Sequence, residues 1–421
     1  MMTLFFPFHL MTMNVEEIKT TNGLNFWFVE DNSVPIISLS FNFSGGAFFD
    51  KKEGTSSFVS ALLDEGAGSY NSEEFQTRMD KLGMKLNFSS SRDSISGTFQ
   101  TISKNKNESF KLLKLIFSNP RFDEQDIDKI RNQIIASLKI NQSNISDIAN
   151  QEFHKNFFAD HSFSKNPNGT IESVIEIKKK DISEYFKNFI TKSNLVMGVS
   201  GDVSKEEIKK LMEETFSNLP LTSNNLTKIS SKKKFPKGTK FIEKDTPQAS
   251  IIFAQKGVSR KDKDFFSARI ANYVLGGGGF QSRLYKNIRE KEGLVYSIYS
   301  YLVPYVNNDL LFGGFQTTNE NVDKTIELVK NEWDLIATKG ISNKKLKDAK
   351  SYYKGSFTRN LTSTSSISSL LRTVQLYGLD KNYFQERNNI IDNITLKDVN
   401  NIAKMIFNSD ELYFVVVGKM K

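Results

Sequence analysis

A segment in the second half of the chain combines a glycine run with two side chains suited to catalysis. Four consecutive glycines begin at Gly276, Arg289 follows among lysines and glutamates, and Tyr296 lies in a stretch with strand character. A guanidinium and a phenol are hydrogen-bond donors that a fold can hold aimed at developing negative charge. Taken alone, the arginine is better explained by a solvated helix face, and the tyrosine by half-buried packing, than by a catalytic role. Their surroundings must decide.

The glycines Gly276, Gly277, Gly278 and Gly279 permit more than one role. A phosphate-binding loop is excluded, because Gln281 stands where G-x-G-x-x-G requires a third glycine and no lysine follows at the P-loop spacing. A turn beside an extended peptide fits, since missing side chains allow close approach. A helix C-cap is the structural alternative and is compatible with that role. We therefore expect the run to contribute to substrate binding.

Cysteine and histidine, the side chains that most often bind zinc, are scarce in this sequence. Cysteine is absent, and the histidines are His9, His154 and His161. The last two stand seven positions apart, near Asn166 and Pro167, whereas paired ligands on a helix stand three or four apart. We expect both to be ordinary surface or capping histidines. No metal site is predicted in the chain.

The charge of the chain does not favour nucleic acid as a partner. Its 421 residues carry a formal charge of +9, but the lysines are scattered among acidic residues and form no stripe with aromatic side chains. A solvated surface is the simpler interpretation. No apolar run approaches the ~20 residues that cross a bilayer, so no integral membrane segment is predicted.

Residues 1–14 are mostly apolar and precede any segment with the pattern of a folded element. They fit the remnant of a secretory signal, although they have neither a basic start nor a small-residue cleavage site. A disordered leader is the alternative. The absence of cysteine suits an oxidising and a reducing compartment equally.

The sequence contains an internal repeat. Asp181 corresponds to Asp398 and Gly201 to Gly418, with the same offset of 217 positions and a helix and a strand in register between them. A chance match in fixed register over two elements is improbable, so a tandem duplication of units of about 200 residues is predicted. We place the units at 15–221 and 238–421, joined by a linker at 222–237 that is rich in Ser, Asn and Lys.

Local patterns predict the same order of elements in both units. Period-two alternation marks the strands, and S/N-x-x-E capping boxes mark helix starts. Strands grouped with helices outside a strict β-α-β alternation favour an α+β fold with mainly antiparallel sheets. The expected elements are strands at 24–29, 37–43 and 249–255, hairpins at 86–102 and 294–317, and helices at 55–63, 71–82, 204–216 and 265–275.

The segment from Val274 to Ser297 resembles the second-domain signature of the insulinase-like (pitrilysin, M16) zinc peptidases. The duplication and the segment from Gly45 to Gly66 support the resemblance, which extends from about Val15 to the C-terminus. It implies two homologous α+β domains. It also implies that Arg289 and Tyr296, seven positions apart, donate hydrogen bonds to the substrate carbonyl and to its oxyanion.

The residues at the positions that match the family's zinc motif, H-x-x-E-H, are not histidine or glutamate. There the chain has Ser57, Ser60 and Ala61, and the distal glutamate ligand falls near Ala136 or Ser137. None of these side chains is a zinc ligand. The resemblance therefore implies a chain that is not a peptidase alone and holds no zinc of its own.

The pattern fits the non-catalytic subunit of a small heterodimeric bacterial M16 peptidase. Such a subunit pairs with a zinc-bearing homologue, encloses peptide substrates and contributes its arginine and tyrosine in trans; peptide is bound by strand addition at a sheet edge. The bacterial periplasm is slightly favoured over the cytoplasm. The alternative is a catalytically silent scaffold with the same fold.

Overall fold

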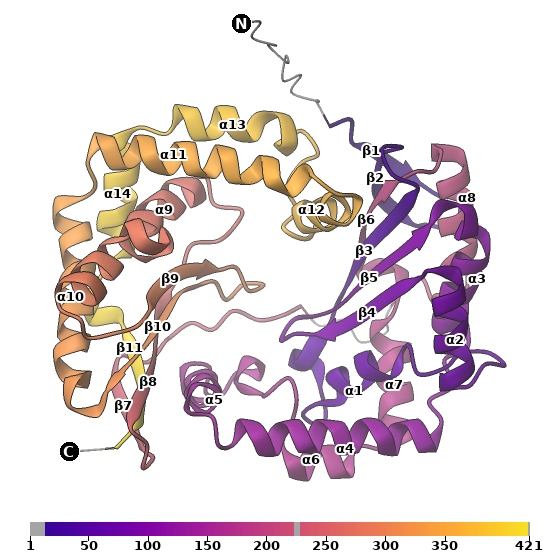
Figure 1. The fold of residues 1–421 in the computed structure, drawn as a ribbon, viewed down its shortest axis with the longest axis horizontal. Helices are drawn as coiled ribbons and strands as arrows, with labels where there is room; N and C mark the ends of the chain where they lie inside the picture. The colour runs from indigo at the N-terminus through magenta and orange to yellow at the C-terminus, as the bar shows by residue number, and fades with distance from the viewer. Residues whose placement is uncertain (1–12, 223–227, 420–421) are drawn as a thin grey trace, which may run out of the picture.

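The computed structural model describes residues 13–222 and 228–419. Within those residues the strands form one six-stranded and one five-stranded sheet, and helices pack on both (Figure 1). The strands are β1 (Glu16–Lys19), β2 (Asn25–Glu30), β3 (Ile36–Ser44), β4 (Lys85–Ser90), β5 (Ser94–Ile102), β6 (Leu195–Gly201), β7 (Gly238–Glu243), β8 (Gln248–Lys256), β9 (Ile298–Val303), β10 (Leu310–Thr318) and β11 (Tyr413–Gly418). The helices are α1 (Thr55–Leu62), α2 (Ser72–Leu82), α3 (Lys106–Ser118), α4 (Glu124–Asn141), α5 (Ile145–Phe157), α6 (Ile171–Glu176), α7 (Lys179–Phe189), α8 (Lys205–Thr215), α9 (Phe265–Asn272), α10 (Val322–Lys339), α11 (Asn343–Thr358), α12 (Thr364–Leu376), α13 (Tyr383–Asn393) and α14 (Leu396–Ile406).

The two sheets have equivalent strand orders. The first runs β1-β2-β6-β3-β5-β4 and the second β7-β11-β8-β10-β9. Strand β6 is parallel to β2 and antiparallel to β3, and β11 is likewise parallel to β7 and antiparallel to β8. All other pairings are antiparallel among the described strands. The predicted α+β fold with mainly antiparallel sheets is confirmed, and the strands that the repeat relates occupy equivalent places.

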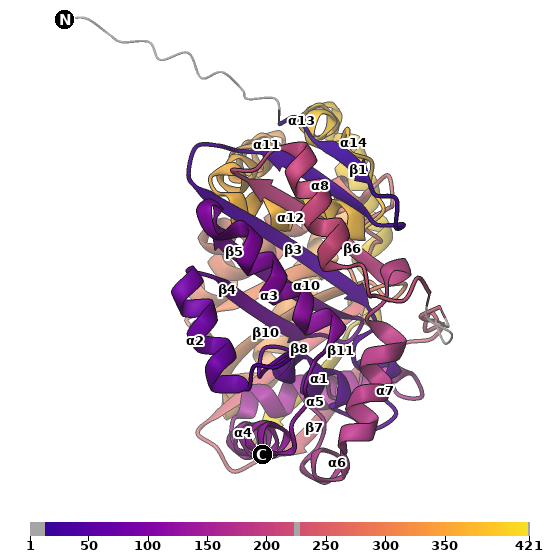
Figure 2. The ribbon, with the colours of Figure 1, turned by 90° about the vertical axis from the view of Figure 1, so that its right-hand side faces the viewer.

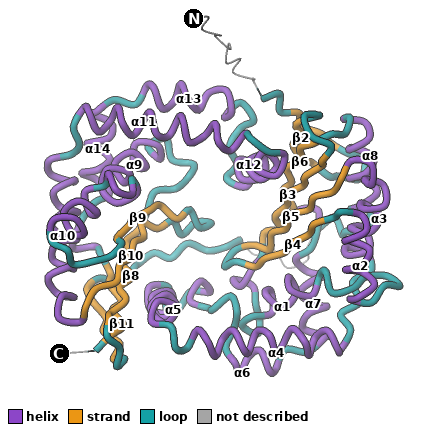
Figure 3. The backbone as a smooth tube through the Cα atoms, viewed as in Figure 1, coloured by secondary structure: helices purple, strands orange, loops and turns teal. Residues whose placement is uncertain are grey.

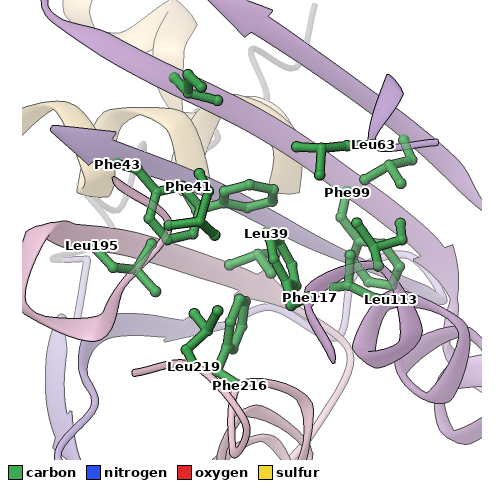
Figure 4. Packing of buried hydrophobic residues seen from close by; sticks show 14 of the residues in the cluster. Leu39, Phe41, Phe43, Leu63, Phe99, Leu113, Phe117, Leu195, Phe216 and Leu219 are labelled. Carbon is green, nitrogen blue, oxygen red and sulfur yellow. The ribbon is translucent and has the colours of Figure 1, made fainter. Parts of the chain in front are cut away.

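The outer face of the first sheet carries its main hydrophobic core. Alternate residues of β3 point to this face and are buried, as period-two alternation predicts. Helices α3 and α8 cover them from outside (Figure 2). Figure 4 shows aromatic rings interleaved with leucines there, and the Phe41 and Phe117 rings meet edge to face with centroids 5.8 Å apart.

The inner face of the first sheet is polar, yet it is buried by a helix from the second half. Ser38 and Ser40 are each 1% exposed. The Ser38 hydroxyl lies 2.8 Å from that of Thr364, and the Ser40 hydroxyl 3.2 Å from that of Ser368, both on α12. Small hydroxyl side chains let the helix approach the strand closely while satisfying each other's hydrogen bonds.

Helix α5 of the first half makes the reciprocal contact with the second sheet. It packs on β8 and β11, where the Ser146 hydroxyl accepts from Gln316 at 2.7 Å and lies 3.4 Å from the Ser250 hydroxyl. In Figures 1 and 3, α5 lies beside β8 and α12 beside β3 and β6, so each half contributes a helix to the other's sheet. The two halves are therefore held together by these helix–sheet contacts as well as by the linker.

Most of the predicted leader, and a smaller part of the predicted linker, lie where the chain is not described. Residues 1–12 and 223–227 fall outside the described ranges. The described remainder of the linker contacts both halves. Ile229 is buried, the Lys232 amide donates to Asn308 Oδ1 of the second half at 2.8 Å, and the Ser230 carbonyl lies 3.1 Å from His161 Nε2 of the first half. The domain boundaries stay predictions. In the part of the chain that is described, none of the helices has the length and apolar character that crossing a bilayer requires.

Candidate functional site

The glycine run forms a turn that is fixed to strand β9. Helix α9 continues at its end into a π-helical turn, Tyr273–Gly277. Asn272 donates from Nδ2 to the Ser300 carbonyl at 2.9 Å, and its Oδ1 accepts from the Ser300 hydroxyl at 2.6 Å. A Cβ at Gly276 would lie 2.8 Å from the Ser300 backbone nitrogen, so only glycine allows the turn to approach the strand this closely.

The other three glycines differ in their surroundings. A Cβ at Gly278 would lie 2.6 Å from the Tyr273 carbonyl oxygen, so packing requires glycine there as well. Gly277 and Gly279 are exposed, and Gly279 has a left-handed φ of 56° with open space around it. Two glycines thus serve the fold and two present bare backbone at the surface. Substrate binding by the run stays a prediction.

Arg289 lies in a second π-helical turn, Tyr285–Lys291, ahead of β9. Its guanidinium stands over the Tyr285 ring, 4.9 Å from the centroid, and no carboxylate of the described residues lies within ion-pair distance. Arg283 differs, because its Nε donates to Glu332 Oε2 at 2.7 Å. Arg289 is therefore a half-buried cation that lies against an aromatic ring and that no carboxylate of the described residues neutralises.

Tyr296 lies between this turn and β9 and is 88% exposed. Its hydroxyl has no hydrogen-bond partner in the described part of the chain, and no contact found there joins it to Arg289. Strand β9 is an edge of the second sheet, and the half-exposed rings of Tyr299 and Tyr301 stack on it with centroids 5.7 Å apart. The edge offers unpaired backbone donors and acceptors beside exposed aromatic rings.

Helix α1 carries the positions that the resemblance assigns to the zinc motif. The Ser57 hydroxyl donates to the Pro167 carbonyl at 2.7 Å, and the Ser60 hydroxyl to the Ser57 carbonyl at 3.0 Å. Ala61 has no ligand atom and packs against the first core. The hydroxyls are thus bonded to backbone carbonyls, and the set does not fit Zn²⁺, which takes imidazole, thiolate or carboxylate ligands.

Helix α4 does not supply the missing ligands. Ala136 and Ser137 lie exposed on it, and Arg131 of the same helix stands over the Phe58 ring of α1, 5.4 Å from the centroid. The charged group that α4 brings against α1 here is therefore a cation, which does not bind a metal ion. Across residues 13–222 and 228–419, no group of three or more His, Asp or Glu side chains is placed to hold a metal ion.

Two family models match the chain over most of its length. The model described as "Insulinase (Peptidase family M16)" matches residues 28–170, and the model described as "Peptidase M16 inactive domain" matches residues 176–353. The chain belongs to the M16 peptidase family.

Other M16 proteins resemble the chain from end to end. The "Non-peptidase homolog YmxG" of Helicobacter pylori is 28% identical over 403 residues, covering 93% of this chain and 91% of its own. The mitochondrial-processing peptidase subunit beta of Neurospora crassa is 24% identical, covering 88% and 80%. The crystal structure of a peptidase M16 inactive domain from Pseudomonas fluorescens matches with a TM-score of 0.92 and 25% identity, covering 97% and 99%. The predicted M16 fold is confirmed, and the relatives include a non-peptidase homologue.

The M16 fold of this chain places a buried carboxyl at the start of α1, which the sequence did not reveal. Asp50 accepts from the amides of Gly54 and Ser56 at 3.0 and 2.9 Å, and from the Ser56 hydroxyl at 3.1 Å. Burial raises the pKa of Asp50 to about 7, although these donors act in the opposite direction. The buried Tyr185 lies beside it. An Asp shortly before a helix was the available signal.

The M16 fold also corrects one of the two predicted histidine environments. His161 caps a short helical turn, with Nδ1 accepting from the Phe163 amide at 3.2 Å, as predicted. His154 is not at the surface, because α5 packs on the second sheet and leaves it 5% exposed. Its Nδ1 donates to the Asn150 carbonyl at 2.9 Å. Burial, and next the charge of Arg92, lower the pKa of His154 to about 3, so it is a neutral structural residue.

Proposed function

We propose that this protein is the non-catalytic subunit of a heterodimeric zinc peptidase. The observation that carries the proposal is a contrast between two sites. The motif positions on α1 hold hydroxyls already bonded within the protein, whereas the Tyr296 hydroxyl is 88% exposed and has no partner among the described residues. A donor aimed away from its own fold is suited to a site that another chain completes.

The edge strand β9 supports a role in holding peptide substrate. An extended peptide can pair with an unpaired strand edge through its backbone, which gives affinity with little sequence readout. Tyr296 immediately precedes that edge, and Arg289 lies in the turn before it. A peptide on β9 would therefore have both donors near its backbone carbonyls, where they can bind the carbonyl oxygen and stabilise negative charge on it.

The partner in this proposal is a zinc-bearing M16 homologue, whose metal would supply the activated water. This chain would contribute the peptide-binding edge and two hydrogen-bond donors. The Neurospora relative is by its name a subunit of a processing peptidase, which supports an assembly of related chains.

A silent scaffold is the second candidate function. The resemblance to a non-peptidase homologue favours it as much as it favours an assisting subunit. Tyr296 and Arg289 distinguish the two candidate functions. An assisting subunit needs an exposed phenol and a cation beside a strand edge, whereas a scaffold does not.

Purification of the protein alone and with its homologue tests the proposal. We expect the isolated chain to contain no stoichiometric zinc and to cleave no peptide, because Ser57, Ser60 and Ala61 are not ligands. The mixture should form a one-to-one complex, by native mass spectrometry, that cleaves peptide faster than the homologue alone. About one chelatable zinc per isolated chain together with activity, or a complex no more active than the homologue, would contradict the proposal.

A further inference from the structure

A pocket of about 440 Å³ lies beside the end of β9, and Asn272, Gly277 and Tyr301 of the candidate site form part of its wall. Its walls come from α9, β9, α11, α12 and α13, which lie close together in Figure 1. Because α12 also packs on the first sheet, the pocket is at the junction of the two halves. Among the described residues that line it are Arg260, Arg269 and Arg387, and no Asp, Glu or Lys.

Arg387 is the most deeply buried of the three arginines, with 4% of its surface exposed. Its Nη2 donates to the Tyr353 carbonyl at 2.9 Å, and its guanidinium stands 4.3 Å from the Phe357 ring centroid. No carboxylate within the described residues comes close enough to form an ion pair with it. Charged groups are rarely buried without a counterion, because desolvation is expensive.

Aromatic groups also hold the other two arginines. Arg260 donates from Nη2 to the Tyr383 hydroxyl at 2.7 Å and stands over the Phe265 ring at 4.4 Å, and Arg269 lies 4.5 Å from the Tyr353 ring centroid. Burial lowers the pKa of Arg260 and of Arg387, and the charge of Arg269 acts in the same direction on both. Arginine stays protonated even so. The pocket therefore concentrates positive charge, and no anionic side chain is among the described residues that line it.

The shape and position of the pocket indicate which anion would neutralise this charge. Guanidinium groups bind carboxylates through paired hydrogen bonds, and aromatic rings hold the fork in place. Tyr301 and Leu302 of β9 line the pocket, so a peptide strand added to β9 would pass its mouth. Tyr301 lies five positions after Tyr296, which corresponds to roughly 17 Å along an extended peptide paired beside them.

We propose that this pocket binds a carboxylate of the extended peptide that pairs with β9. The carboxylate is either the C-terminus of the peptide or an Asp or Glu side chain about five residues from the bond facing Tyr296. This inference rests on the peptide-binding part of the proposed function, but not on zinc, turnover or the partner chain.

Binding of fluorescent peptides to the full-length protein alone tests the pocket. The probes are peptides of about ten residues, long enough for a full strand, built from β-branched and polar residues without acidic side chains. One form has a free C-terminus, one has a C-terminal amide, and an amidated series carries a single Glu at successive positions. We expect the free acid, or one Glu position, to bind about 10- to 100-fold more tightly than the plain amide, as measured by anisotropy.

Substitution of Arg269 links any such preference to the pocket. Arg269→Gln should abolish it, since this half-exposed arginine can lose its charge without uncovering a buried cavity. Arg359→Gln, at an exposed arginine of the same half, is the matched control and should leave it unchanged. Equal binding of all peptides, no binding by any of them, or a preference that survives Arg269→Gln would overturn the inference. This assay measures binding and not cleavage. Its outcome is therefore independent of whether the heterodimer turns over substrate.

Discussion

At the scale of single residues, some hydroxyl groups form hydrogen bonds within the protein, whereas others in the described part of the chain are left free for an external partner. The Ser57 and Ser60 hydroxyls donate to carbonyls within the molecule, so they stabilise α1 and its neighbouring loop. The Tyr296 hydroxyl has no such partner among the residues that the structure describes, and its side chain is exposed to solvent. The same contrast holds for arginines, because Arg283 is paired with Glu332, whereas Arg289 contacts the Tyr285 ring and forms no ion pair within the described ranges. Unpaired groups of this kind are the ones to test for function.

Asp50 gives a residue-scale prediction about pH. Its pKa is about 7 in the folded protein and near 3.8 in the unfolded chain, so the folded state keeps its proton to higher pH. Its contribution to stability is therefore fully present below about pH 4 and is lost as the pH rises toward 7, by up to roughly 4 kcal/mol. Asp50→Asn removes this titration. Urea unfolding at pH 4.5 and 7.5 should show wild type losing stability relative to the variant at the higher pH.

The opposite sign would contradict the Asp50 prediction. If wild type gains stability over Asp50→Asn as the pH rises, the carboxylate is ionised and the donors at the start of α1 outweigh its burial. A difference that is the same at both pH values would show that the group does not titrate in this range.

At the scale of elements, the exchange of α5 and α12 between the halves decides the architecture. Gly198 of β6 faces α12, and a Cβ there would lie 2.6 Å from Leu371 Cβ and 2.7 Å from the Arg372 amide nitrogen. The helix can therefore approach the sheet only where the strand has no side chain. Serines on β3 and on α12 continue the same close seam.

Gly198→Ala tests this seam. The methyl group must displace backbone atoms of α12, so we expect a loss of about 1–3 kcal/mol in unfolding free energy, seen as a lower melting temperature. Gly355→Ala is the matched control, because Gly355 lies within α11 with nothing near its Cβ position. That change should be neutral or stabilise the helix by about 0.5–1 kcal/mol. Equal melting temperatures for the two variants would show that the seam tolerates expansion.

Local elements were predictable from sequence, and contacts between distant segments were not. The capping boxes at Asn71 and Ser204 and the buried alternation of β3 depend on residues a few positions apart, and all are as predicted. The burial of Ser38 depends on Thr364, which is 326 positions away. His154 was misjudged for the same reason. At the candidate site, the segment with Arg289 and Tyr296 was recognisable, whereas the arginine pocket is assembled from five elements and has no sequence signal.

At the scale of the whole molecule, the two halves have similar folds but carry different functional groups. The first half has the helix on which M16 peptidases place zinc, but with serines and alanine at those positions. The second has an exposed strand edge, two uncommitted donors and a positively charged pocket. In the proposed function, these features of the second half are parts of a peptide-cleaving site whose metal another chain would supply. Its function is therefore expected in an assembly with a related chain.

The most direct measurement is single-turnover peptide cleavage by the assembled heterodimer with Tyr296→Phe in this subunit. The substitution removes only a hydroxyl that makes no contact within the described protein, so assembly should be unchanged by native mass spectrometry. The cleavage rate should fall about 10²–10³-fold, or about 2.7–4 kcal/mol, as for loss of one oxyanion donor, and Arg289→Ala should act in the same direction. Lys291→Ala, at an exposed cation of the same turn, is the control and should have no effect. If the Tyr296→Phe and Arg289→Ala heterodimers cleave within about twofold of wild type, the assisting role is contradicted and the scaffold function is favoured.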